Sequence, residues 1–399
     1  MDFKNYLVPG KTGLLIGIGG VSMSPLAEVL HDAGLDIRGS DMAESSNTLT
    51  LRERGIPIHI GHSADNVTDD ISFVIRTAAV HDDNPEVHEA HRRGIPVFER
   101  TQAWGALMRG YQNALCISGT HGKTTTTSMC THIMMAAEKD PTVMIGGTLP
   151  LLKACHRVGK GNTIIMESCE YYNSFLALNP TIAVVLNIEA DHLDFFKDLE
   201  DIKHSFRCFA ERVPAETGTV IANYDDANTM DALRGIARKV ITFGLNAKAD
   251  VYAQNIVHRG SVSEFDIYHR GNYFARVTLH VPGIHNVRNA LAATAAAIVL
   301  GVSPNAVKYG LAGFEGAGRR FDFKGKFQGA DLYDDYAHHP SELRALLDAV
   351  DTLNYQRTIV VFQPHTYSRT AKLFNDFVEQ LRRPTIVYLA EIYACLLYT

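Results

Sequence analysis

The chain has 399 residues, of which 46% are apolar and 21% charged, and its formal net charge is -6. This composition is typical of a globular protein with two or three domains and excludes a largely disordered chain. Because there is no basic excess, we expect no nucleic acid partner, and small ligands must be held by local sites. The six cysteines form no Cys-x-x-Cys pair, the first residues lack the apolar core of a signal peptide, and the apolar run 290–302 is too short to span a bilayer. We therefore expect a cytoplasmic protein with reduced thiols and no membrane insertion.

The first segment predicts a βαβ unit. A strand is expected at 13–18, a helix reaches about residue 33, and a second strand follows at 36–38. The motif Arg-Gly-Ile-Pro then occurs at 54–57 and at 93–96, each time between an expected helix and a short strand. This alternation predicts a doubly wound parallel sheet.

The loop G-I-G-G-V-S-M at 17–23 joins the first strand to its helix. Ser22 stands where a third glycine would complete the G-x-G-x-x-G motif, and Asp41 follows at the spacing of a ribose-binding carboxylate. The loop therefore favours a nucleotide diphosphate at a helix N-terminus. From these residues alone, NAD and another nucleotide remain equally open.

The second segment begins with an apolar strand that leads into G-T-H-G-K-T at 119–124. Gly119 lets the backbone fold around an anion, and the amides that follow can point at phosphate oxygens. Lys123 would neutralise the phosphates, and Thr124 would supply a hydroxyl to Mg²⁺ at the start of a helix. The spacing is shorter than in G-x-x-x-x-G-K-[ST], so an ordinary strand-to-helix turn is the alternative interpretation.

Acidic residues and a histidine end the neighbouring strands. Glu167 closes the strand 163–166, and the strand 182–187 leads into Glu189, Asp191, His192 and Asp194. In a doubly wound sheet these strand ends meet at one edge, which is the arrangement that a magnesium–nucleotide site needs. Each carboxylate could instead be solvated or could cap a helix.

The remaining segments complete a three-domain prediction. Period-two alternation at 250–281 predicts an antiparallel insert, and from residue 324 we expect strands at 332–334, 358–362 and 385–389 with helices at 341–353 and 368–381. No further strands or helices follow that would complete this domain, and the tail 395–399 does not end in a polar segment. We therefore expect a truncated or frame-shifted end. The fold class predicted is α/β, with a Rossmann-like N-terminal domain (1–112), a P-loop ATPase-type central domain with the antiparallel insert (113–322), and an incomplete Rossmann-like C-terminal domain (323–399).

Five motifs in order resemble the Mur ligase family of peptidoglycan synthesis. They are G-T-H-G-K-T-T-T at 119–126, N-I-E-A-D-H-L-D at 187–194, H-N-V-R-N-A at 285–290, G-R-R-F at 318–321 and D-D-Y-A-H-H-P at 334–340. The resemblance implies an ATP-dependent ligase that joins L-alanine to UDP-N-acetylmuramate. In such a reaction the carboxylate becomes an acyl phosphate, and the amine of alanine then displaces phosphate.

The resemblance also implies roles for individual residues. Lys123 would steady the transferring phosphoryl group, Thr124 and Glu167 would hold one Mg²⁺, and His192 would hold a second. The remaining ATP contacts implied are Gly119, Thr120, His121, Gly122 and Thr125 at the phosphates, Asn286, Asn289 and His285 at adenine, Asp335 at ribose, and Arg320 at phosphate or ribose.

For the other two substrates, the resemblance implies that Gly19, Gly20 and Ser22 lie near the diphosphate of UDP, that Ser40 and Asp41 lie near its nucleoside, and that His338, His339 and Arg369 lie near the incoming amino acid. His339 precedes Pro340, so its alternative role is to start a helix. Cys169 and Tyr172 stand where many relatives have aspartate, and we assign them no role.

Two other functions remain open at this stage. One is a related ligase that adds a recycled peptide to UDP-N-acetylmuramate, and the other is a UDP-sugar-binding fragment with impaired catalysis. The sequence leaves the oligomeric state, monomer or homodimer, undecided.

Overall fold

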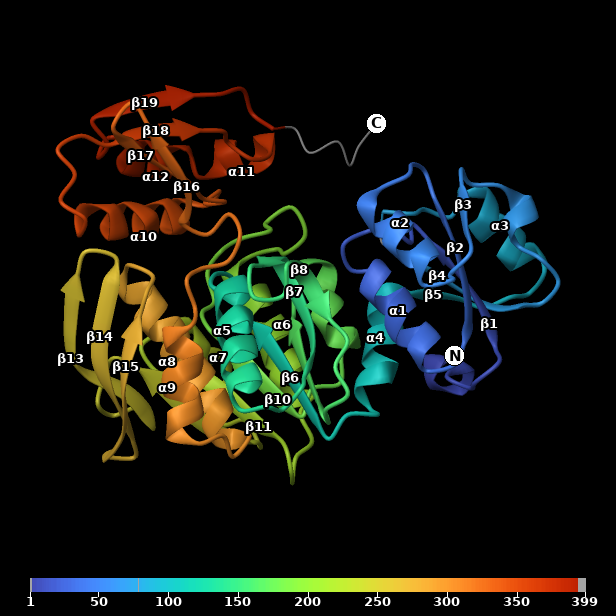
Figure 1. The fold of residues 1–399 in the computed structure, drawn as a ribbon, viewed down its shortest axis with the longest axis horizontal. Coiled ribbons are helices and arrows are strands. Elements are labelled where there is room, and N and C mark those ends of the chain that lie inside the picture. Colours follow the sequence, from blue (N-terminus) through green and yellow to red (C-terminus); the bar gives the residue numbers. More distant parts are fainter. Residues whose placement is uncertain (1, 78, 394–399) are drawn as a thin grey trace.

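The computed structural model describes residues 2–77 and 79–393, so the tail 395–399 lies outside the described residues. Figure 1 shows an N-terminal domain and a C-terminal domain on different sides of a larger central domain. Among the described residues, no helix combines the length and the apolar character needed to cross a bilayer. The predicted α/β class with three domains is confirmed.

The N-terminal domain is built on a parallel sheet with strand order β3-β2-β1-β4-β5. All five residues of β1 are buried, which explains its position at the centre. The strand expected to end at residue 38 continues to Asp41. The elements are η1 Phe3–Tyr6, β1 Thr12–Ile16, α1 Ser24–Asp32, β2 Asp36–Asp41, α2 Ser46–Glu53, β3 Ile58–Ile60, η2 Ala64–Asn66, β4 Ile71–Arg76, α3 Pro85–Arg92, β5 Val97–Glu99 and α4 Arg100–Met108.

The central domain contains a ten-stranded sheet with the order β15-β14-β13-β12-β11-β10-β6-β9-β7-β8. Strands β13 to β15 are antiparallel, which confirms the predicted insert, whereas the antiparallel β7–β8 hairpin was not predicted. The elements are β6 Asn113–Ser118, α5 Lys123–Ala136, β7 Thr142–Leu149, β8 Ala154–Arg157, β9 Thr163–Glu167, η3 Tyr171–Ala177, β10 Ile182–Val185, α6 Leu199–Glu211, β11 Thr219–Asn223, α7 Ala227–Ala232, β12 Lys239–Gly244, β13 Val251–Arg259, β14 Val262–His269, β15 Asn272–Leu279, α8 Ile284–Val299 and α9 Pro304–Ala312.

The C-terminal domain differs in two ways from the predicted alternation. The strand expected at 332–334 pairs in an antiparallel hairpin with the unpredicted β16, because Gln328 and Gly329 adopt positive φ and turn the chain. The helix expected at 368–381 breaks at Leu373 into two. The elements are β16 Asp322–Phe327, β17 Ala330–Asp334, α10 Pro340–Asp351, β18 Ile359–Phe362, α11 Tyr367–Lys372, α12 Phe374–Leu381 and β19 Ile386–Leu389, with β18 and β19 parallel.

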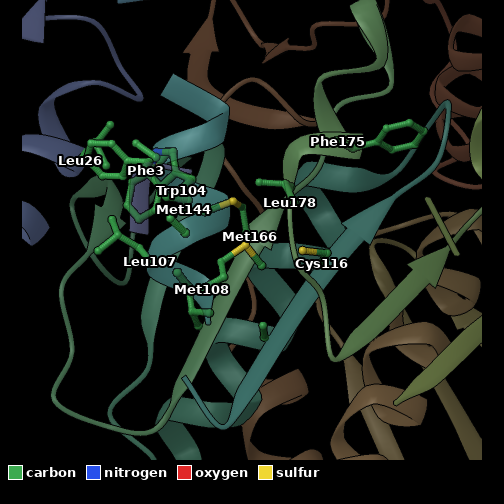
Figure 2. Close-up of a cluster of buried hydrophobic side chains, with 14 of the residues drawn as sticks. Phe3, Leu26, Trp104, Leu107, Met108, Cys116, Met144, Met166, Phe175 and Leu178 are labelled. Carbon is green, nitrogen blue, oxygen red and sulfur yellow. The ribbon is translucent and has the colours of Figure 1, made fainter. Parts of the chain in front are cut away.

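One apolar core runs from the N-terminal into the central domain (Figure 2). Trp104, Leu107 and Met108 of α4 belong to the same buried cluster as Met144 of β7 and Met166 of β9. The C-terminal domain has a separate small core around Leu343, Phe362 and Phe377. The first two domains are therefore joined by continuous apolar packing, and the third is not part of that core.

Candidate active site

Three adjacent strands bring the predicted site residues to one edge of the central sheet. β6 lies between β10 and β9, with Ser118 opposite Val185 and Ile117 opposite Glu167. The phosphate-loop residues 119–122 follow β6, Glu167 ends β9, and residues 186–194 follow β10. The three candidate motifs are therefore neighbours in space, as the parallel arrangement predicts.

The phosphate loop depends on glycine at Gly122, the residue before α5. Its φ is +83°, and a Cβ there would lie 2.7 Å from Asn289 Oδ1, so both the backbone and the contact exclude a side chain. Asn187 fixes the loop from the other side, because its Oδ1 accepts from His121 N–H at 2.8 Å and its Nδ2 donates to His121 O at 3.1 Å. The sequence analysis did not assign Asn187, although it lies in the N-I-E motif.

Lys123 is turned toward its own loop. Its Nζ donates to the carbonyls of Gly119 at 2.6 Å and Thr120 at 3.1 Å, and it forms an ion pair with Glu170 at 3.0 Å. Burial favours the neutral amine, but the carboxylate of Glu170 outweighs burial and raises the pKa of Lys123. The amine is therefore held as a cation in a buried site. No role was predicted for Glu170 from the sequence, and only the fold places it beside Lys123.

Thr124 and Glu167 meet as predicted for a metal site. Thr124 Oγ1 donates to Glu167 Oε1 at 3.1 Å, while Glu167 Oε2 accepts from Gly146 N–H at 2.7 Å. Two hard oxygen donors at a helix N-terminus suit a divalent cation that is also bound to phosphate. The observed donor set therefore fits Mg²⁺.

His192, predicted to hold a second Mg²⁺, lies beside Glu170 and Tyr171. Its Nε2 is 4.0 Å from Glu170 Oε1, and its ring stacks on Tyr171 with centroids 4.3 Å apart. Burial lowers the pKa of His192, so the imidazole is neutral and able to ligate a metal. Tyr171 in turn donates its hydroxyl to Asp194 at 2.6 Å.

A cavity of about 570 Å³ opens beside the phosphate loop, a size suited to a small-molecule ligand. Asn286 donates to Pro282 O at 2.7 Å, and Asn289 donates to Asn286 Oδ1 at 3.3 Å, which orients both amides. Burial lowers the pKa of His285 to about 4. The cavity lining includes the predicted contacts His121, Gly122, Thr124, Thr125, His285, Asn286, Asn289, Arg320 and Asp335.

Asp335, predicted at the ribose, is engaged by the protein backbone in this structure. Its oxygens accept from Phe321 N–H at 2.7 Å and from Ala337 N–H at 2.8 Å. Burial raises the pKa of its carboxyl group. A ribose hydroxyl would therefore have to share this carboxylate with the backbone.

Polar side chains join the C-terminal domain to the central domain. Arg369 Nη2 and Nε donate to Asp191 Oδ1 at 2.9 and 3.2 Å. Burial raises the pKa of Asp191, but the neighbouring His192 and Arg369 outweigh burial and lower the pKa to about 2. His338 donates its backbone N–H to Glu342 Oε2 at 2.9 Å. The side chain of His339 accepts from Ser341 N–H at the start of α10, so the helix-start role foreseen for it is present.

The N-terminal loop is held by its own domain. Gly19 N–H donates to Asp41 Oδ2 at 2.8 Å, and Ser22 Oγ accepts from Arg100. Ser40, expected near a nucleoside, is buried and donates to Glu86 Oε2 at 2.7 Å. A second cavity of about 1000 Å³ has lining residues from all three domains, among them Asn47, Thr124, Gly146, Arg320 and Tyr336.

Three family models cover most of the chain. The Mur ligase family catalytic domain matches residues 15–112, the Mur ligase middle domain matches 117–297, and the Mur ligase glutamate ligase domain matches 319–392. The chain belongs to the Mur ligase family. This membership agrees with the five motifs and with their positions at the two cavities.

Among curated Mur ligases, the UDP-N-acetylmuramate–L-alanine ligase of Agathobacter rectalis is 46% identical over 95% of this chain and 83% of that protein. The enzyme of the same name from Clostridium novyi is 45% identical over 99% of this chain and 85% of that protein. The crystal structure of the UDP-N-acetylmuramate–alanine ligase of Thermotoga maritima has a TM-score of 0.79 at 31% identity, covering 96% of this chain and 85% of that one.

Proposed function

We propose that this Mur ligase joins L-alanine to UDP-N-acetylmuramate with ATP and Mg²⁺, giving UDP-N-acetylmuramoyl-L-alanine, ADP and phosphate. The observation that carries the proposal is the contact of Thr124 with Glu167 and of the adjacent Lys123 with Glu170 at the strand ends, with Thr124 lining both cavities. Relatives at 45–46% identity carry the name of this reaction and match nearly the whole chain. Since ATP and the nucleotide sugar are cytoplasmic metabolites, we also propose a cytoplasmic location.

Lys123 provides the main local positive charge for the triphosphate. In the structure its amine is satisfied by two loop carbonyls and Glu170. Phosphate oxygens would compete for these hydrogen bonds while the ion pair keeps the amine charged. The amides at the start of α5 face the same anion. Lys123 and these amides would stabilise the negative charge that spreads over the transferring phosphoryl group.

ATP supplies the phosphoryl group that activates the carboxylate of UDP-N-acetylmuramate as an acyl phosphate. Thr124 and Glu167 would hold a metal ion that would offset the negative charge of the phosphates, and His192 would hold a second ion. Thr124 lines both the nucleotide cavity and the three-domain cavity, which supports a meeting of the two substrates beside it. Closure of the C-terminal domain would exclude water from this acyl phosphate.

Arg369 is our proposed anchor for the carboxylate of alanine. Its guanidinium already binds a carboxylate in the structure, that of Asp191, through two nitrogens. The carboxylate of an amino acid would present the same chemistry to the same two donors. His338 lies in the same region, with its ring centroid 5.7 Å from that of His365.

A peptide-adding ligase is the second candidate. The structure of the UDP-N-acetylmuramate:L-alanyl-γ-D-glutamyl-meso-diaminopimelate ligase of Neisseria meningitides has a TM-score of 0.69 at 26% identity, covering 77% of this chain and 99% of that one. The two candidates share their nucleotide chemistry and differ in the acceptor. Supplying L-alanine or the tripeptide as the acceptor therefore separates them.

The test is phosphate release from ATP by the 399-residue chain in the presence of UDP-N-acetylmuramate, with L-alanine added or withheld. Release that requires both substrates, and that falls by about 10²-fold or more in Lys123→Ala, supports the proposal. Lys308→Ala, at an exposed lysine on α9, is the matched control and should leave the rate unchanged. Release with the tripeptide alone would replace the proposal by the second candidate. Binding of UDP-N-acetylmuramate without release would leave only a UDP-sugar-binding protein.

A further inference from the structure

Three potential metal ligands meet where the central and C-terminal domains touch. His121 comes from the phosphate loop, Glu189 follows β10, and His339 precedes α10. One ligand atom from each lies within 4.8 Å of the other two. None of the three belongs to the Thr124, Glu167 and His192 group proposed for magnesium.

The hydroxyl of Ser341 marks the centre of this cluster. Ser341 Oγ donates to Glu189 Oε2 at 2.6 Å, and it lies 2.6 Å from His339 Nδ1 and 3.1 Å from His121 Nε2. A single small atom is thus within hydrogen-bond distance of one polar atom of each of the three side chains. The side chains already converge on one point, as they must around an ion.

We propose that His121, Glu189 and His339 form a second, distinct cation site that takes a divalent ion of the zinc class, such as Zn²⁺, Co²⁺ or Ni²⁺. Two imidazoles and one carboxylate are a common zinc donor set, whereas Mg²⁺ prefers oxygen ligands and several waters. The proposal does not depend on the ligase activity, because it rests on the donor set alone.

One ring nitrogen of His121 already has a carboxylate partner, as imidazoles that bind metals commonly do. Its Nδ1 lies 3.3 Å from Glu342 Oε1, which leaves Nε2 facing Glu189 at 3.5 Å. A carboxylate on one imidazole nitrogen commonly fixes the tautomer and orients the other nitrogen toward a metal. Glu342 also adds a second negative charge next to the cluster, which favours a cation.

His339 provides an independent observation. Its Nδ1 accepts from Ser341 N–H, so Nε2 is the nitrogen left to bind a metal. The residue is 6% exposed, and Nε2 is a buried atom without a hydrogen-bond partner among the described residues. Buried ring nitrogens normally have a partner, so an unpaired one in a cluster of ligands indicates that the ring is arranged for something besides the helix start.

The ligand atoms have to move only a little to bind an ion. Zinc–nitrogen and zinc–oxygen distances are about 2.0–2.2 Å, compared with the 2.6 and 3.1 Å that separate Glu189 Oε2 and His121 Nε2 from Ser341 Oγ. Rotations of the side chains cover this difference, and the serine hydroxyl can rotate away or serve as a fourth ligand. Because the ligands come from two domains, the bound ion would hold the central and C-terminal domains together.

The experiment is a titration of the full, metal-free chain with Co²⁺ in excess Mg²⁺, without ATP or UDP-sugar, followed by the visible absorption of bound Co²⁺ and its displacement by Zn²⁺. We expect one bound Co²⁺ per chain and a Kd at least tenfold weaker in His339→Gln and in Glu189→Gln. His338→Gln is the matched control, because His338 is the adjacent residue and lies outside the trio.

Two results would overturn the site. One is no Co²⁺ binding in the presence of Mg²⁺. The other is binding that survives in both His339→Gln and Glu189→Gln but is lost in Glu167→Gln, since the ion would then occupy the magnesium position. Circular dichroism of each variant establishes that it is folded, and Glu342→Gln, expected to weaken binding by about tenfold through His121, provides a further variant that alters no ligand.

Discussion

The two domain interfaces of this protein are made of different chemistry. The N-terminal and central domains share one buried apolar cluster through α4, with Trp104 2% exposed at its centre. The central and C-terminal domains instead meet through charged and polar contacts, including Arg369 with Asp191 and His121 with Glu342. Lys372 adds a hydrogen bond to Leu193 O at 2.8 Å.

The apolar interface is therefore expected to persist regardless of pH and ligands, whereas the polar interface depends on both. Apolar burial contributes about 25 cal/mol per Å² and does not depend on the protonation of any group. Polar contacts depend on charge, can be replaced by water or ligand, and contribute little net stability for each contact. We infer that α4 keeps the first two domains together, while the third domain opens and closes around ligands.

The largest effect is expected from Trp104→Ala in the apolar interface. Removing this buried ring should lower the free energy of unfolding by about 3–5 kcal/mol, because the lost burial leaves a cavity. The urea midpoint of the transition that includes the N-terminal domain measures the loss. Tyr309→Ala, at a site 67% exposed, should change it by less than about 0.5 kcal/mol.

The polar interface should weaken at alkaline pH. Burial disfavours the charged form of His121, but its bonds to Glu189 and Glu342 dominate and raise its pKa to about 9, above the ordinary value of about 6.5. The stabilisation by protonated His121 is therefore complete below about pH 6.5 and is lost as the pH rises through about 9. Each unit of pKa difference corresponds to about 1.4 kcal/mol, so the free energy that holds this interface should fall by up to about 3 kcal/mol.

Hydrogen exchange, corrected for its intrinsic pH dependence, measures this prediction. Amides of α10 should lose protection between pH 6.5 and 9, and those of α4 should keep theirs. His121→Gln should remove the pH dependence at α10. Equal loss of protection at both helices would contradict the distinction between the two interfaces.

Gly105→Ala tests how closely α4 must approach the central domain. A Cβ at Gly105 would lie 2.0 Å from the carbonyl oxygen of Ala177, so the helix or the η3 segment must move. We expect a loss of about 1–3 kcal/mol, typical of overpacking. At Gly110 the added Cβ would meet Leu107 O at 3.3 Å, so Gly110→Ala should cost less in the same urea titration.

The smallest effect is expected at the polar rim of the apolar interface. His156 Nε2 lies 3.2 Å from Glu28 Oε1, and Arg54 remains 3.4 Å from the other oxygen of the same carboxylate. His156→Gln should therefore cost only about 1 kcal/mol, because Glu28 keeps a charged partner. A loss as large as that of Trp104→Ala would show that polar contacts, and not the apolar core, hold these two domains together.

Much of the fold was predictable from local pattern. The apolar strands and glycine-rich loops of the first two domains repeat with the periods of parallel α/β structure, and Pro340 correctly indicated a helix start after His339. The β16–β17 hairpin was missed because the burial of β16 alternates weakly, with most of its residues exposed. The helix break at Leu373 was not predictable, because no proline or glycine lies in this segment to indicate it.

The candidate site was predictable at the level of motifs and not of pairings. The phosphate loop, Glu167 and His192 follow from strand ends, and the roles given to them remain predictions. The partners of these residues are set by tertiary structure, as with Glu170 at Lys123 and Asp191 at Arg369, which lie 47 and 178 residues apart in the chain. No local periodicity encodes such contacts.

Where Arg369 binds the carboxylate of a ligand, as proposed above, Asp191 would compete with that ligand for the guanidinium. A tethered carboxylate acts at an effective concentration of roughly millimolar or more, so a free carboxylate of ordinary affinity does not displace it. A ligand would displace Asp191 from Arg369 only if other contacts, such as those to the ligand's amine, contribute additional binding free energy. The internal carboxylate would thereby disfavour simple acids and favour molecules that carry a second group for the protein to bind.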